Sequence, residues 1–250
     1  MRHAAGRSVS DRETPWLRQH HKSACIRVIV TDINHLFANA MPHTRFTDSI
    51  TTPEALRDVI GSPNARVVAK LIDRLDTHCR AFIAKSPFLL IASADGQGKV
   101  DVSPKGDPAG FVHVLDDHTL AIPERPGNRL ADTLLNILGK PQVGLLFMVP
   151  GKAETLRAGG TAQIVRDRSL LDSMAVNGKP PLLATVVTVD RVFFHCAKCV
   201  IRSSLWQPDA WPDLAGLPTL AQAIIDHAKL NESVLEVQAG IDESYRDRLY

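Results

Sequence analysis

From residue 88 onward, apolar and polar residues follow patterns that are typical of short β-strands. The expected strands are residues 88–94, 99–103, 110–115, 119–123, 143–149, 154–165 and 182–196. The first two are joined by the glycine-containing turn at 95–98, which predicts a β-hairpin. At least seven short strands with tight turns favour a closed antiparallel barrel over a βαβ sheet.

Helical patterns precede and follow these strands. Thr52-Pro53-Glu54 places a threonine N-cap before a proline at the first helical position, which predicts a helix start. Between Asn64 and Ile83, apolar residues recur three and four apart, which predicts one amphipathic helix with Cys79 on its buried face as a small hydrophobe. The further expected helices are residues 130–138, 219–230 and 232–250.

Residues 1–52 differ in composition from the rest of the chain. They hold five of the ten histidines and a single glycine, and their one apolar stretch has no partner strand or turn signal. We interpret them as a disordered or atypical N-terminal extension, which could also be a wrongly chosen start or a mobile lid. Residues 53–250 are expected to form a single domain that ends in helices.

Composition and charge exclude several classes of protein. Hydrophobic residues make up 44% and charged residues 22%, as in soluble globular proteins. With 29 Lys and Arg against 27 Asp and Glu, the net charge is +2, which is too small to indicate nucleic-acid binding. No apolar run approaches the ~18 residues of a membrane helix. Four scattered cysteines do not form a disulfide framework, so we expect a cytoplasmic protein.

Glycine placement excludes common nucleotide and hydrolase sites. The chain has no G-x-G-x-x-G opening a helix after a strand, no P-loop lysine motif and no G-x-S-x-G elbow. Gly159-Gly160 lies within an expected strand, which predicts a bulge or a close approach of another backbone.

Three polar segments interrupt the pattern, each after an expected strand: residues 102–108 (VSPKGDP), 122–129 (IPERPGNR) and 197–202 (AKCVIR). Together they offer the cations Lys105, Arg125, Arg129, Lys198 and Arg202, with Ser103 and Asn128 as neutral hydrogen-bonding groups. In the second segment, Asn128 could cap a helix that starts near Arg129, where a helix N-terminus and an arginine favour phosphate. A capped helix with solvated arginines is the alternative.

A further cluster lies at the last expected strand end. His195, Cys196 and Cys199 have half of a zinc-site spacing, but the chain holds no second such pair. The usual context of a redox dithiol is also missing. We therefore expect no metal, and we interpret the two cysteines as ordinary small hydrophobes at a strand-to-helix junction.

The order of these elements, with the segments DVSPKGD (101–107), ERPGNRLAD (124–132) and NIL (136–138), resembles a known family. It is similar to the FMN-binding split-barrel flavoproteins of the pyridoxamine 5′-phosphate oxidase class, and closest to a bacterial branch with these two motifs. The resemblance extends from about Asp48 to Trp206. It implies a mainly β fold with flanking helices, an antiparallel split β-barrel of the FMN-binding type.

The resemblance also implies a flavin site in a cleft between two subunits of a homodimer. The implied cofactor-binding residues are Ser103, Lys105, Gly106, Pro123, Glu124, Arg125, Asn128, Arg129, Lys198 and Arg202. The first segment would face the flavin or its ribityl chain, and the second would hold the phosphate and offer backbone groups beside the ring. Lys198 and Arg202 would close the site. Arg157 is either a further contact or part of a structural ion pair, and His195 lies near the flavin edge or is simply packed.

These implications lead to an expected function, an FMN-dependent oxidoreductase that acts on an unknown small molecule, without nucleic-acid or membrane partners. No Arg-x-His equivalent follows Trp206, so pyridoxamine phosphate oxidation itself is not expected. Two alternatives remain: a non-catalytic flavin-binding or storage protein, and a split barrel that binds haem or deazaflavin.

Overall fold

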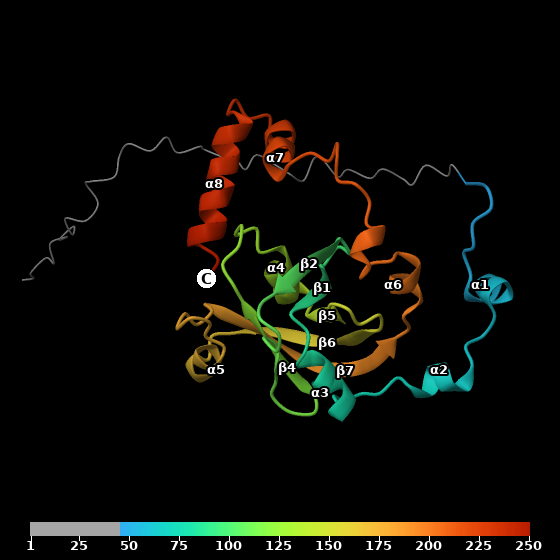
Figure 1. Ribbon diagram of the computed structural model, residues 1–250. Helices are drawn as coiled ribbons and strands as arrows, with labels where there is room; N and C mark the ends of the chain where they lie inside the picture. Colours follow the sequence, from blue (N-terminus) through green and yellow to red (C-terminus); the bar gives the residue numbers. More distant parts are fainter. Residues whose placement is uncertain (1–45) are drawn as a thin grey trace, which may run out of the picture. The chain divides into compact units, whose positions relative to one another are not determined.

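The computed structural model describes residues 46–250, and the chain divides into two compact units, Met1–Gly61 and Ser62–Tyr250 (Figure 1). In the first unit, helix α1 (Pro53–Ile60) starts where the sequence predicts. The Thr52 hydroxyl accepts a hydrogen bond of 3.2 Å from the amide of Ala55. The predicted extension over residues 1–52 lies almost wholly outside the described residues.

The second unit contains the remaining helices and all described strands. Its helices are α2 (Ala65–Ala69), α3 (Thr77–Ile83), α4 (Asp132–Gly139), α5 (Arg168–Ser173), α6 (Lys198–Arg202), α7 (Leu220–Ala228) and α8 (Val234–Asp247), with a short 3₁₀ helix at Pro208–Ala210. Its strands are β1 (Phe88–Ala94), β2 (Val100–Gly106), β3 (His113–Val114), β4 (Thr119–Glu124), β5 (Gln142–Met148), β6 (Thr155–Val165) and β7 (Leu183–His195). Over residues 46–250, no helix is both long and apolar enough to span a bilayer.

The strands form one antiparallel sheet in the order β2-β1-β5-β6-β7-β4-β3. Since β2 and β3 are the two edges of this sheet, the prediction of a closed barrel is wrong, and the split barrel is confirmed. Two local features limit backbone pairing at these edges. Strand β3 is only two residues long, and Pro104 in β2 has no N–H to offer to another strand.

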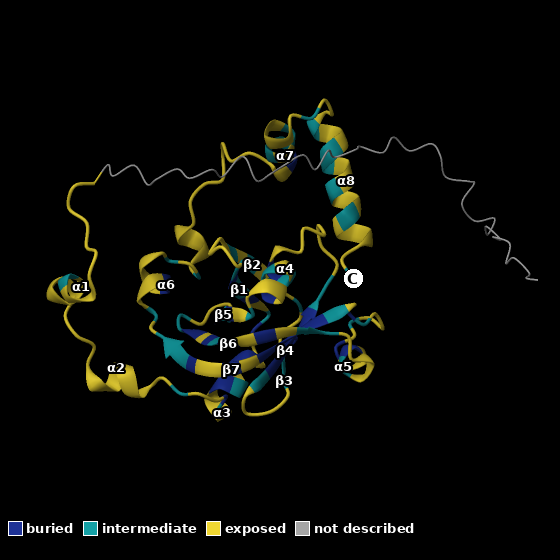
Figure 2. Cartoon of the chain, turned by 180° about the vertical axis from the view of Figure 1, so that it is seen from behind, coloured by how far each residue is buried: buried dark blue, intermediate teal, exposed yellow. Residues whose placement is uncertain are grey.

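The main core lies on one face of the sheet, and a smaller buried cluster that includes Leu171 of α5 lies on the other side of β4 and β7. Figure 2 shows buried residues concentrated in the strands and in α3. Alternate residues of β1 and β5, such as Leu89 and Phe147, are fully buried against Cys79 and Ile83 of α3. Burial raises the pKa of the Cys79 thiol to about 12, so the prediction of an inert core cysteine is confirmed.

The single helix predicted from Asn64 to Ile83 is wrong, because two helices form instead. Helix α2 ends at Ala69, and Ile72 then exchanges backbone hydrogen bonds of 3.1 and 2.7 Å with Val192 of β7. The Asp76 carboxylate accepts a hydrogen bond of 2.9 Å from the amide of Cys79 and starts α3. Only the second half of the apolar pattern therefore faces the core.

The glycine pair in β6 has the predicted effect. The register between β6 and β7 shifts between Gly159 and Gly160, as in a β-bulge. A Cβ at Gly160 would overlap the carbonyl oxygen of Thr188, whereas a Cβ at Gly159 would meet its nearest atoms at 3.8 Å. The backbone approach is thus confined to the second glycine.

We therefore predict that Gly160→Ala destabilises the fold by about 2 kcal/mol or more, because strand β7 must move away from the new methyl group. The matched variant Gly159→Ala should change the free energy of unfolding by less than about 1 kcal/mol. Urea denaturation of both variants measures the difference. Equal effects of the two substitutions would contradict the close approach at Gly160.

Candidate functional site

The two motif segments come together through an ion pair between Lys105 and Glu124. The Lys105 ammonium lies 2.5 Å from one Glu124 oxygen, and both side chains are largely buried, at 17% and 10% exposure. The other Glu124 oxygen accepts a hydrogen bond of 2.7 Å from the Thr185 hydroxyl. The sequence predicts that the first polar segment follows the end of a strand. This prediction is wrong, because β2 itself continues to Gly106. It therefore carries Lys105 along the open edge of the sheet.

A second ion pair joins the same segments. The guanidinium of Arg125 lies 2.6 Å from Asp107, with side-chain exposures of 14% and 1%, and donates to the Met174 carbonyl at 2.8 Å. The Tyr250 hydroxyl donates to the other Asp107 oxygen at 2.8 Å, and the Tyr250 ring lies 5.5 Å from the Arg125 guanidinium. We call these two pairs, with Thr185 and Tyr250, the ion-pair cluster.

Sequence reasoning missed Tyr250. It lies just beyond a mostly polar helix, and no local pattern links it to a segment more than a hundred residues earlier. In the described chain, the C-terminal helices α7 and α8 bring it back to Asp107. The hydrogen bond to Asp107 raises the pKa of Tyr250 above its ordinary value.

The other residues that were expected to contact the cofactor from these segments lie within strands β2 and β4. Ser103 is half-buried and lies opposite Ile91, and Gly106 lies opposite Phe88 at the end of the same ladder. Pro123 is buried in β4. Lys105 and Arg125 are already paired with Glu124 and Asp107, and these two ion pairs hold the motif segments together.

The loop before α4 differs from the prediction. Asn128 does not cap the helix, because its side chain accepts a hydrogen bond of 3.0 Å from the amide of Leu130, and α4 starts only after Ala131. Arg129 and Ala131 both adopt left-handed backbone angles, with φ of 65° and 59°, which are uncommon outside glycine. The chain thus turns twice before the helix begins.

This loop leaves α4 without a side-chain cap. Ala131 at the N-cap position has no polar side chain for the first-turn amides. Arg129 beside it is exposed, and within residues 46–250 it has no hydrogen bond or ion pair. Thr133 and Asn136 tie α4 to the sheet through hydrogen bonds of 3.0 Å to Asp101 and Ser93. The uncapped helix start and the unpaired arginine favour an anion, whereas the Asp132 carboxylate in the first turn of α4 opposes one.

Lys198 and Arg202 lie on α6, and both are exposed. In the part of the chain that the structure describes, no hydrogen bond or ion pair connects them to the ion-pair cluster. Cys196 and Cys199 lie at the strand-to-helix junction between β7 and α6, where the sequence places them, and both are exposed. Among the described residues, no group of three or more His, Cys, Asp or Glu could hold a metal ion.

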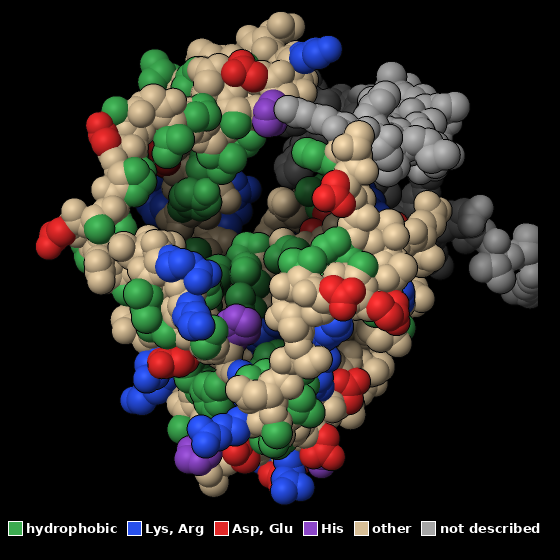
Figure 3. Space-filling model, turned by 90° about the vertical axis from the view of Figure 1, so that its right-hand side faces the viewer, with side chains coloured by type: hydrophobic (Ala, Val, Ile, Leu, Met, Phe, Trp, Pro, Cys, Tyr) green, Lys and Arg blue, Asp and Glu red, His purple; other side chains and the backbone are tan. Residues whose placement is uncertain are grey.

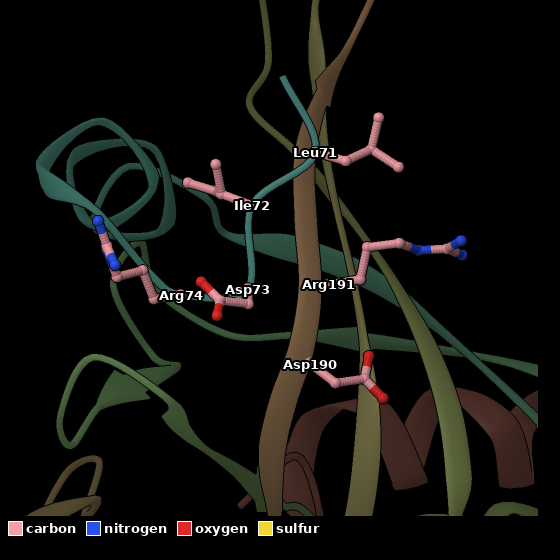
Figure 4. A pocket seen from close by; sticks show the side chains of 6 residues that line it. All are labelled: Leu71, Ile72, Asp73, Arg74, Asp190 and Arg191. Atoms are coloured by element: carbon pink, nitrogen blue, oxygen red, sulfur yellow. The ribbon is translucent and has the colours of Figure 1, made fainter. Parts of the chain in front are cut away.

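Two cavities lie outside the ion-pair cluster. The larger, of about 690 Å³, covers the outer face of β1, β5, β6 and β7 beside α6. Figure 3 looks onto the side of the molecule where α6 lies, and hydrophobic side chains gather there beside cationic ones and a histidine. The smaller, of about 390 Å³, has charged residues that do not converge: Figure 4 shows Asp73 and Arg74 on one side of β7 and Arg191 on the other.

The fold defines an antiparallel split-barrel protein, and the comparisons identify its family. Residues 75–196 match the family model described as pyridoxamine 5′-phosphate oxidase. The chain belongs to the pyridoxamine 5′-phosphate oxidase-like family. No curated protein matches it.

Solved structures with similar folds come from several bacteria. HupZ of Group A Streptococcus is 20% identical, with a TM-score of 0.40, over 48% of this chain and 92% of that chain. A Clostridium acetobutylicum protein related to general stress protein 26 is 13% identical, with a TM-score of 0.36, over 47% and 85%. HutZ of Vibrio cholerae, described as a haem storage protein, is 16% identical, with a TM-score of 0.35, over 48% and 94%. At this level of identity, no ligand or activity carries over.

The contact of Tyr250 with Asp107 predicts an unusual titration. The chain has two tyrosines, Tyr245 and Tyr250, so Tyr245→Phe leaves one phenol to follow by absorbance. We expect it to ionise above the ordinary pKa of about 10, because its proton is held by Asp107. The hydrogen bond from Tyr250 to Asp107 stabilises the fold fully at a pH below the ordinary tyrosine pKa. This stabilisation is lost as the pH rises through the raised pKa of Tyr250.

The control is the double variant Tyr245→Phe, Asp107→Asn, in which the phenol should titrate close to its ordinary value. Circular dichroism defines the pH range in which the fold is intact. A phenol in the Tyr245→Phe variant that titrates at an unshifted pKa would contradict the placement of Tyr250.

Proposed function

We propose that this protein binds FMN, with the flavin phosphate at the N-terminus of α4. The observation that carries this proposal is the uncapped start of α4 beside the unpaired Arg129. Helix amides and an arginine fork are the donors that proteins use for phosphate oxygens. The donor set therefore fits the phosphate of FMN, as the family resemblance implies.

Each site residue then has a role. Arg129 and the first amides of α4 would hold the phosphate, and Asn128 would fix the loop through Leu130. Lys105 and Arg125 would position the two motif segments rather than neutralise the phosphate, because Glu124 and Asp107 already pair with them. Ser103, Gly106 and Pro123 would line the strands beside the ring. When bound, the flavin would supply the transfer of electrons or hydride.

The same proposal extends to the activity. We infer an FMN-dependent oxidoreductase that acts on a small molecule as a cytoplasmic homodimer, in which Lys198 and Arg202 close the site. The exposure of both side chains on α6, without partners in the described chain, supports their availability for this role.

Arg129→Ala should weaken FMN binding by about 2 kcal/mol or more, because a charge-assisted hydrogen bond to phosphate is lost. The matched control is Arg168→Ala, which removes an exposed arginine of α5 that pairs with Asp172 and should leave affinity unchanged. Flavin fluorescence titration of apoprotein measures both.

An unchanged FMN affinity in Arg129→Ala would overturn the phosphate assignment. The absorption spectrum of the purified protein, with mass spectrometry of the released chromophore, separates the alternatives. FMN supports the proposal, whereas haem or deazaflavin would replace it. FMN that is reoxidised only by oxygen would indicate a flavin-binding or storage protein.

A further inference from the structure

Residues 212–250, which we call the strap, lie largely outside the packed core. They contain α7 and α8, which pack against each other, and Figures 1 and 2 show both helices beyond β2 and α4 at one side of the sheet. Among the residues of the strap, all of which the structure describes, only Ala221 is buried. The family match ends at residue 196, so the strap lies beyond the part of the chain that defines the family.

Tyr250 fastens the strap to the motif segments. Its hydroxyl donates to Asp107 at 2.8 Å, and its ring lies 5.5 Å from the Arg125 guanidinium. Its backbone oxygen accepts a hydrogen bond of 3.3 Å from the Lys179 ammonium. Across residues 46–250, every hydrogen bond between the strap and the rest of the chain involves Tyr250, and no ion pair joins the two. One residue therefore holds a segment of two helices.

A segment with so few buried contacts opens at a lower free energy than the core. Helix α7 has 9 residues and α8 has 14, and helices of this length are marginal in water once they are detached. Residues 212–219, at the start of the strap, are exposed and form no helix or strand. Before them, the Trp206 indole donates to the Lys152 carbonyl at 2.9 Å and fixes the chain beside the turn between β5 and β6. Release of Tyr250 thus frees the strap and leaves the sheet intact.

The fastening point is next to the proposed phosphate site. Arg125 directly precedes the loop at 126–131, which contains Arg129. With Tyr250 in place, the side chains of Asp107 and Arg125 are only 1% and 14% exposed. Such a buried pair is rigid only while its remaining polar atoms have partners, and Tyr250 is one of these partners. Loss of Tyr250 therefore loosens the base of the loop.

From this geometry we propose that opening of the strap at Tyr250 controls how fast FMN enters and leaves the loop at 126–131. This regulation rests on the proposed function. Exchange through an opened state is proportional to the population of that state, so the strap sets both rates without contacting the phosphate. If Tyr250 were only a packing contact of the ion-pair cluster, its loss would weaken the affinity for FMN, and the strap would open only with the whole fold.

Hydrogen–deuterium exchange of the full chain without ligand tests the opening. Protection factors in α7 and α8 should be about a hundredfold or more below those in β1 and β5, which lie in the core. Tyr250→Phe keeps the ring and removes the hydroxyl, so protection of α7 and α8 should fall by a further factor of about ten, as for one hydrogen bond to a carboxylate. The control is Tyr245→Phe, an exposed tyrosine of α8, which should change nothing.

Stopped-flow fluorescence of FMN tests the control of the site. Tyr250→Phe should raise the rate constants for binding and for release about tenfold each, and leave Kd within about a factor of two, because both pass through the opened state. Lys179→Met removes the other hydrogen bond to Tyr250 and should act in the same direction. Tyr245→Phe should leave both rate constants unchanged. Circular dichroism establishes that each variant is folded.

Equal protection of the strap and of β1 and β5, or unchanged protection of α7 and α8 in Tyr250→Phe, would overturn the opening of the strap. Faster opening with unchanged FMN rate constants, or a change in Kd alone, would overturn its control of the site. A chain that binds no FMN would overturn the proposed function and this regulation with it. The exchange data distinguish that failure, because they are recorded without ligand and still show whether the strap opens.

Discussion

The open sheet depends on the ion-pair cluster between β2 and the end of β4. These two strands are not neighbours in the sheet, so no backbone ladder joins them. Two largely buried ion pairs, Lys105–Glu124 and Asp107–Arg125, connect them instead. Buried ion pairs stabilise only where further hydrogen bonds satisfy the remaining polar atoms, because the loss of hydration is otherwise larger than the Coulomb attraction. Thr185, Met174 and Tyr250 supply those bonds here.

This arrangement gives the paired residues and the loop that follows them different tasks. The paired residues connect the two strands, and the exposed loop at 126–131 carries the phosphate contact that we propose. In this loop, strained left-handed residues and an uncapped helix start occur next to one another. Such local strain persists only where the surrounding structure fixes it, and the cluster immediately before the loop provides that rigidity.

Much of the fold could be predicted from patterns that are local. The β1–β2 hairpin, strands β6 and β7 and the close approach at Gly160 follow from alternation and glycine placement. The open edges did not follow, because a count of strands says nothing about which strands pair. The helix break after Ala69 depends on backbone bonds between Ile72 and Val192, more than a hundred residues apart. The partners of Lys105 and Arg125, and the role of Tyr250, are likewise long-range, so residue type indicated a site but not which charges were already paired.

The most direct test of this account is a double-mutant cycle on Asp107 and Arg125. Urea denaturation of Asp107→Asn, Arg125→Met and the double variant gives the coupling free energy of the pair. The account predicts at least about 2 kcal/mol for this buried pair, and less than about 1 kcal/mol for the same cycle on the exposed pair Arg80–Asp117. A coupling free energy near zero for Asp107 and Arg125 would contradict the claim that side-chain ion pairs hold the split barrel together.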